Sequence, residues 1–306
     1  MKIQVAVCLA MLSCVGRAES GELTIRNETL EVRFDAAANS FSAESGGVTF
    51  VRDGQLRESG GEARVASIED TAFGRGQSIE IAYRGGNSAA IQVFPKAPFV
   101  LFRSSLRNGG VEPSVTNKLR PLAFSVDFGA PVTSLQVLGT GGLTDPGNAP
   151  GSYMWAAAAE PASRRGVVAG WITSNRGGGV VFPGVREGRV RMEAEIDYGK
   201  LLLRPGQSAA LETFALGYFS DARFGLEAWA DTVARIYRIK LPPQPVGYCT
   251  WYHARASNEK DLAAQAAFAA EQLKPFGLEF LQIDDGWQDG IKTNGPKKNF
   301  SRVNPS

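Results

Sequence analysis

The most telling residues of the chain are Gly277-Leu278-Glu279-Phe280-Leu281-Gln282-Ile283-Asp284-Asp285-Gly286-Trp287-Gln288, where an apolar strand pattern ends in two adjacent carboxylates. Strands of parallel barrels are apolar along their length and carry polar functional residues at their carboxyl ends. Ionised carboxylates accept hydrogen bonds from hydroxyl groups, and an indole offers an apolar face to a sugar ring. The pattern is typical of a sugar site, and a surface Asp-Gly turn after a core strand is the plainer alternative.

A second strand pattern lies upstream, in Pro245-Val246-Gly247-Tyr248-Cys249-Thr250-Trp251-Tyr252-His253. Between the two patterns, residues 257–273 are expected to form a helix that ends at Gly277, with Leu262, Ala266, Ala269 and Leu273 on one face. A strand, a helix and a strand with short connections predict a parallel βαβ unit. Trp251 and Asp284 should therefore stand at the same end of the sheet.

The two strand patterns resemble the clan of retaining glycosidases that contains the α-galactosidases and raffinose synthases. The resemblance rests on Tyr248-Cys249-Thr250-Trp251-Tyr252 and on Leu281-Gln282-Ile283-Asp284-Asp285-Gly286-Trp287-Gln288. It implies that Trp251 packs against a galactose and that Asp284 and Asp285 accept hydrogen bonds from its outer hydroxyls. Trp287 is predicted to belong to the same substrate-binding set.

The resemblance implies no catalytic residue within this sequence. In the related enzymes the nucleophilic Asp follows a Lys on a later strand, and the acid/base Asp comes later still. Retaining chemistry needs two carboxyl groups about 5 to 5.5 Å apart, whereas adjacent residues of a strand start on opposite faces. Residues 245–306 are also far fewer than the about 250 of a complete α/β barrel. We therefore expect a truncated barrel that is inactive by itself.

The rest of the chain predicts a large antiparallel β-sandwich over residues 19–220, because short alternating strands separated by Gly and Asn recur there. Helical spacing of Leu226, Trp229 and Val233 then predicts a helix over residues 221–237. Leu241-Pro242-Pro243-Gln244-Pro245 cannot be helical and reads as a stiff connector. We expect residues 221–244 to link the sandwich to a barrel domain that begins at residue 245.

The first residues have the pattern of a signal peptide. Lys2 precedes an apolar segment, and small residues near Ala18 suit cleavage, so residues 1–18 predict export to the periplasm or the medium. Acylation of Cys14, as in a bacterial lipoprotein, is the less favoured alternative. The apolar segment is shorter than the about 20 residues of a membrane span. Cys249 is expected to pack as a small apolar residue.

Composition limits the class of ligand. A net charge of +2 with 21% charged residues gives no basis for nucleic-acid binding, so a neutral ligand fits better. One histidine and a single cysteine beyond the leader argue against a zinc site, and no cofactor is implied. The expected partner is an oligosaccharide or polysaccharide with terminal α-linked galactose. A galactosyltransferase of the raffinose-synthase type and a non-catalytic carbohydrate-binding sandwich remain as alternatives, and the oligomeric state is left open.

Overall fold

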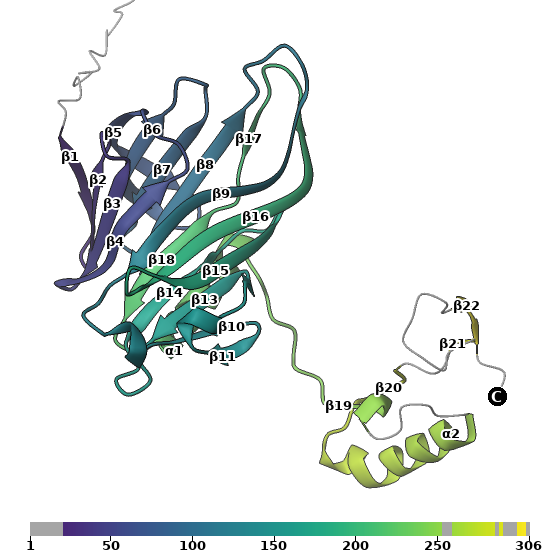
Figure 1. Ribbon diagram of the computed structural model, residues 1–306. Coiled ribbons are helices and arrows are strands. Elements are labelled where there is room, and N and C mark those ends of the chain that lie inside the picture. The colour runs from purple at the N-terminus through teal and green to yellow at the C-terminus, as the bar shows by residue number, and fades with distance from the viewer. Residues whose placement is uncertain (1–20, 253–258, 285–287, 290–298, 304–306) are drawn as a thin grey trace, which may run out of the picture. The chain divides into compact units, whose positions relative to one another are not determined.

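The computed structural model describes residues 21–252, 259–284, 288–289 and 299–303 (Figure 1). The chain forms two compact units, which divide between Ile239 and Lys240. The predicted signal segment lies outside the described residues.

The first unit contains two antiparallel sheets. One has eight strands in the order β1-β2-β3-β4-β9-β16-β15-β12. The pairing of β9 with β16 joins segments that are distant in sequence, and the register shifts after Ala194 and again after Asp197. The strands are β1 (Glu22–Arg26), β2 (Leu30–Asp35), β3 (Ser40–Ser45), β4 (Val48–Leu56), β9 (Ser114–Val126), β16 (Arg189–Leu203), β15 (Gly178–Arg186) and β12 (Ser152–Tyr153).

The other sheet has ten strands, nine of them in the order β11-β10-β13-β14-β18-β8-β7-β6-β5, and β17 pairs with β8 off this path. Two 3₁₀ turns, η1 (Val132–Ser134) and η2 (Pro146–Asn148), flank β10 and β11. The strands are β11 (Gly142–Thr144), β10 (Gln136–Gly139), β13 (Trp155–Ala159), β14 (Gly166–Trp171), β18 (Phe214–Phe219), β8 (Val100–Arg107), β7 (Ser88–Val93), β6 (Gly74–Ala82), β5 (Glu62–Asp70) and β17 (Ser208–Ala210).

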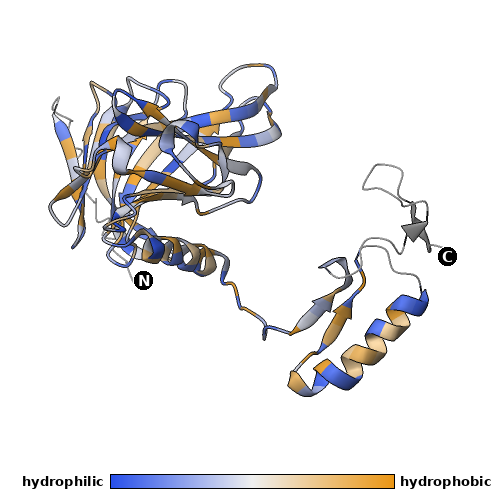
Figure 2. Cartoon of the chain, turned by 60° about the horizontal axis from the view of Figure 1, so that its bottom comes forward, coloured by the Kyte–Doolittle hydropathy of each residue, from blue (hydrophilic) through white to orange (hydrophobic). Residues whose placement is uncertain are grey.

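The main core lies between the two sheets, as expected for a sandwich. Phe41 of β3 meets Phe102 of β8 with ring centroids 4.9 Å apart, and Phe124 of β9 meets Phe214 of β18 at 6.3 Å. Trp171 is fully buried and contacts Phe214 edge to face at 5.2 Å. Apolar and polar residues alternate along β2 and along the first half of β16, and Figure 2 shows apolar and polar residues on the strands of this unit. The predicted antiparallel sandwich is therefore confirmed.

Helix α1 (Ala222–Tyr237) covers part of the ten-stranded sheet and forms a second apolar cluster with it. Asp221 caps the helix, because its carboxylate accepts a hydrogen bond from the backbone N–H of Arg223 at 3.0 Å. Trp229 is half-buried in this cluster, and its ring lies 6.5 Å from that of Trp155. The predicted helix is present, and it packs on the sandwich unit.

The second unit begins with an irregular connector, of which residues 241–246 are exposed. Strand β19 (Gly247–Cys249) pairs in parallel with β20 (Phe280–Gln282), which confirms the predicted parallel pair. The remaining elements are η3 (Thr250–Tyr252), α2 (Glu259–Phe268), a π-helical turn η4 (Ala269–Leu273), η5 (Lys274–Phe276), β21 (Gln288–Asp289) and β22 (Asn299–Val303).

The helical segment of this unit differs from the predicted one in two ways. It is α-helical only through Phe268 and then continues as a wider π turn and a tighter 3₁₀ turn before Gly277 ends it at φ 97°. Ala266 is exposed, whereas Gln265 is half-buried and accepts a hydrogen bond from the Tyr248 hydroxyl at 3.4 Å. A polar contact therefore occupies the place where the periodicity predicted an apolar one.

The second unit buries little apolar surface within the described residues. Phe268, Phe276 and Phe280 are 59%, 88% and 44% exposed, and Ala269 is the only buried residue of the helical segment. Figure 2 shows apolar residues on the strands and the helix of this unit. One parallel pair is described, so the start of a truncated eight-stranded barrel remains a prediction. Within the described ranges, no helix is long and apolar enough to cross a membrane.

Candidate functional site

The faces of the small parallel sheet are defined by its contacts with α2. The Tyr248 side chain reaches Gln265 of that helix, so Tyr248 points to the helical side. Successive strand residues alternate in direction, and Cys249 therefore points to the opposite side. Its cross-strand partner in the parallel register is Gln282. Polar groups on this second face thus come from both strands.

The close approach of the two strands depends on Gly247. A methyl group at this position would lie 2.1 Å from the ring of Phe280, its partner in the register. The aromatic ring therefore occupies the space above the glycine. This contact, together with the bond from the Glu279 N–H to the Val246 carbonyl at 2.8 Å, fixes which residues of the two strands are neighbours.

Asp284 is attached through its backbone to the end of the other strand. Its N–H donates to the hydroxyl oxygen of Thr250 at 3.0 Å, and Thr250 is only 2% exposed. Strand β20 ends at Gln282 and strand β19 at Cys249, so this bond joins the two carboxyl ends. Asp284 is thereby brought beside the turn that carries Trp251.

The carboxylate of Asp284 lies on the face that points away from α2. Its Oδ2 accepts hydrogen bonds from the Cys249 thiol and from the Gln282 amide, each at 3.4 Å. Both are long contacts, and a thiol is a weak donor. These groups orient the half-buried carboxylate. Cys249 is therefore a polar neighbour of the site, contrary to the expectation of purely apolar packing.

The structure describes two of the four predicted sugar-binding residues, Trp251 and Asp284. Trp251 is half-buried in η3, directly after Thr250, and so stands at the same end of the sheet as Asp284. Asp285 and Trp287 lie outside the described residues. The structure brings the Trp251 turn and Asp284 together, and the roles of all four side chains stay predictions.

The chemistry available at this end of the sheet is hydrogen bonding by a carboxyl group next to an aromatic turn. A carboxylate accepts from hydroxyl donors, and an indole packs on the C–H side of a pyranose. Within the described residues no group of three or more His, Cys, Asp or Glu side chains is placed to hold a metal ion. The arrangement suits recognition of a polyhydroxylated neutral ligand.

Thr250 and Cys249 were not singled out from the sequence as site residues. Both lie in the segment that carries the resemblance, directly before Trp251. The parallel register pairs Gly247 with Phe280 and Cys249 with Gln282, and so places Thr250 close to Asp284. That register depends on the length and path of the intervening helix, which periodicity alone does not fix.

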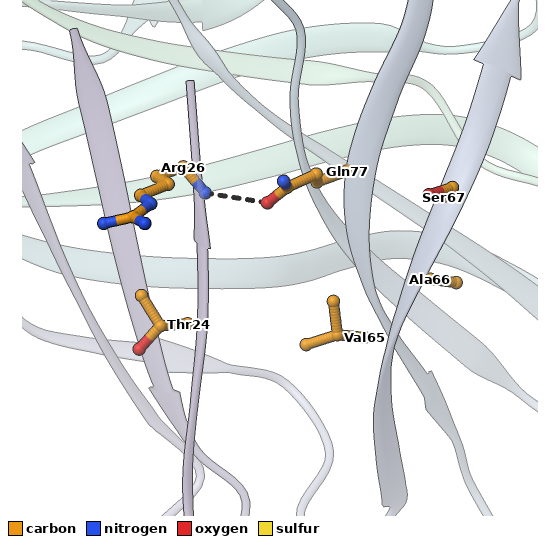
Figure 3. Close-up of a pocket in the computed structure, with 6 residues that line it drawn as sticks. All are labelled: Thr24, Arg26, Val65, Ala66, Ser67 and Gln77. Atoms are coloured by element: carbon orange, nitrogen blue, oxygen red, sulfur yellow. Dashed lines mark hydrogen bonds between the residues drawn. The ribbon is translucent and has the colours of Figure 1, made fainter. Parts of the chain in front are cut away.

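The first unit has a separate concave feature, a hollow of about 600 Å³ lined by residues of β1, β5 and β6 (Figure 3). The backbone N–H of Arg26 donates across it to Oε1 of Gln77 at 3.0 Å. No acid, histidine or cysteine is among its lining residues. They are Thr24, Arg26, Val65, Ala66, Ser67 and Gln77. This hollow therefore lacks an acid or a base that could activate the hydroxyls of Thr24 and Ser67.

A scan against protein-family models and a search of the curated proteins each find no match to the sequence. Solved structures of similar fold do exist. The α-galactosidase from Lactobacillus brevis is 12% identical with a TM-score of 0.53, and the match covers 87% of this chain and 49% of that one. The chain thus spans about half the length of that structure.

The GH36 α-galactosidase AgaA from Geobacillus stearothermophilus is also similar, in two variant forms. The form in complex with 1-deoxygalactonojirimycin is 14% identical with a TM-score of 0.51. The form in complex with raffinose is 14% identical with a TM-score of 0.50. Each match covers 88% of this chain and 50% of the AgaA chain. Identities this low show a galactosidase-like fold, and the fold alone.

Proposed function

We propose that this chain is part of an exported α-galactosidase-like glycoside hydrolase that acts on terminal α-linked galactose by a retaining mechanism. In this proposal the second unit is the start of the catalytic barrel, and residues 1–18 direct export. The observation that carries it is the bond between the Asp284 N–H and the Thr250 hydroxyl, which holds an acidic strand end beside the Trp251 turn.

The proposed role of Asp284 is binding. Its carboxylate accepts hydrogen bonds from outer hydroxyls of the galactose, and Asp285 shares that task. Trp251 and Trp287 supply the apolar contact with the ring. Retaining hydrolysis needs a nucleophile and an acid/base, which are two carboxyl groups about 5 to 5.5 Å apart. We assign neither catalytic role to Asp284 or Asp285.

Two lines of argument support galactose as the sugar. The sequence from Leu281 to Gln288 resembles that of α-galactosidases, and a GH36 enzyme of similar fold has been solved with raffinose, an α-galactoside.

A titration with two sugars that are epimers at C4 tests the proposal. The full chain is titrated with methyl α-D-galactopyranoside and with methyl α-D-glucopyranoside, and binding is followed through the NMR shift of the Asp284 amide. We expect the galactoside to shift this amide with Kd on the order of 1 mM, corresponding to about −4 kcal/mol. The glucoside should produce no shift at the same concentrations. Equal shifts with both sugars, or none with either, would contradict the proposal.

A further inference from the structure

We infer that Thr250 is a positioning residue of the sugar site and that Cys249 assists it, with Asp284 as the group on which both act. The inference deepens the proposed function and rests on it for its sugar-binding consequence. Its structural part, the restraint of Asp284, stands on contacts within the second unit.

The backbone restraint comes from the Thr250 hydroxyl. The oxygen accepts the Asp284 N–H at 3.0 Å, and the side chain is nearly inaccessible at 2% exposure. A buried hydroxyl with a fixed partner has little freedom to exchange it for water. Asp284 follows the last residue of β20 by two positions, where a chain without such a bond would be free to turn away.

The side-chain restraint comes from the face opposite α2. The Cys249 thiol and the Gln282 amide converge on the same oxygen, Oδ2 of Asp284. Two donors on one oxygen limit rotation of the carboxylate about its side-chain bonds. The backbone bond and these contacts together specify where the carboxylate points, and a binding carboxylate needs a set direction to meet hydroxyl donors at good geometry.

Paired substitutions separate the hydroxyl of Thr250 from its shape. Thr250→Val keeps the size and removes the acceptor, whereas Thr250→Ser keeps the acceptor and removes a methyl group. We expect Thr250→Val to raise the Kd for methyl α-D-galactopyranoside about tenfold, the loss of one hydrogen bond, and Thr250→Ser to stay within about twofold. Cys249→Ala should raise the Kd about threefold, and Cys249→Ser should restore it.

Amide hydrogen exchange supplies a readout that needs no sugar. In Thr250→Val the Asp284 amide should exchange about tenfold faster, while the Glu279 amide, which donates to the Val246 carbonyl, keeps its rate. Thr250→Ser should leave both amides unchanged. Loss of protection at Glu279 as well would mean that the strands have come apart, and would overturn the assignment of a local restraint.

The two readouts distinguish failure of this inference from failure of the proposed function. If the unsubstituted chain binds the galactoside and Thr250→Val binds equally well, the positioning role is wrong and the function stands. If the unsubstituted chain binds no galactoside but Thr250→Val selectively speeds exchange of the Asp284 amide, the restraint stands and the proposed function is wrong. Equal loss of binding in Thr250→Val and Thr250→Ser would also overturn the inference, because the hydroxyl would not be the cause.

Discussion

The sandwich and the βαβ unit bury their apolar residues to very different extents. Phe50, Phe124 and Trp171 of the sandwich are fully buried, whereas Phe276 of the second unit is 88% exposed. Burial of apolar surface is the main favourable contribution to folding, so the first unit has a core of its own and the second has little. The predicted sugar-binding residues nevertheless all lie in the second unit. The buried core and the predicted recognition residues thus lie in different units of the chain.

The largest expected effect is at the sandwich core. Trp171→Ala should lower the free energy of unfolding by about 3 to 5 kcal/mol, because it removes a buried ring and leaves a cavity. Phe276→Ala, at an exposed aromatic of the second unit, should change it by less than about 0.5 kcal/mol. Urea unfolding followed by far-ultraviolet circular dichroism measures the free energy of unfolding of both variants. Equal losses of unfolding free energy in the two variants would contradict the difference in packing between the two units.

Hydrogen exchange compares the same two regions without any substitution. Amides of β8 and β18 should be protected at least about 100-fold more than amides of β19 and β20, a difference of about 2.7 kcal/mol in opening free energy. The amides of β19 and β20 should exchange faster because few side chains pack over this pair, where Phe280 and Val246 are 44% and 53% exposed. Comparable protection in the two regions would show that the second unit is stabilised by contacts outside those described.

Two glycine substitutions sharpen the comparison. A methyl group at Gly179 would lie 2.2 Å from the ring of Trp171, which is fully buried and has no room to move. Gly179→Ala should therefore cost about 1 to 3 kcal/mol, as overpacking does. Gly247→Ala meets the half-exposed ring of Phe280, which can swing into solvent, and should cost clearly less. Calorimetric unfolding of both variants checks the order, and the reverse order would contradict this account of the packing.

The smallest effect concerns the helix cap of the sandwich unit. The hydrogen bond from the Arg223 side chain, with help from its backbone N–H, lowers the pKa of Asp221 from the ordinary 3.8 to about 2. The ionised cap therefore stabilises the fold above about pH 4, and this contribution is lost as the pH falls from about 4 to 2. The difference in urea midpoint between the unsubstituted chain and Asp221→Asn should shrink over that range. A constant difference would show that the cap is not the titrating group.

Local patterns predicted the elements well and their long-range pairing poorly. The helix over residues 221–237 and the stop at Gly277 were predicted from signals that neighbouring residues carry. The placement of β9 between β4 and β16 is not, because it joins segments far apart in the chain. The alternation of apolar and polar residues shows which face of a strand is buried, but it does not specify which strands pair with it.

At the candidate site, too, the sequence predicted individual residues but not the contacts between them. Asp284 could be singled out because an apolar strand ends there, and Trp251 because it closes the preceding strand pattern. The restraint of Asp284 by Thr250 and Cys249 depends on the parallel register of the two strands that the helical segment connects, and alternation does not specify that register. That segment departs from regular α-helix after Phe268, and the pattern of apolar residues did not predict the change.

The most direct test of the central claim is the affinity of the full chain and of Asp284→Ala for methyl α-D-galactopyranoside, measured by the same calorimetric titration. Glu279→Ala is the matched control, since Glu279 is an exposed acid that precedes the same strand at its other end. We predict that Asp284→Ala weakens binding by about 1.5 to 3 kcal/mol, or about 10- to 150-fold, and that Glu279→Ala leaves it unchanged. Unchanged affinity in Asp284→Ala, or equal weakening in both variants, would contradict a sugar-binding carboxylate at the end of β20.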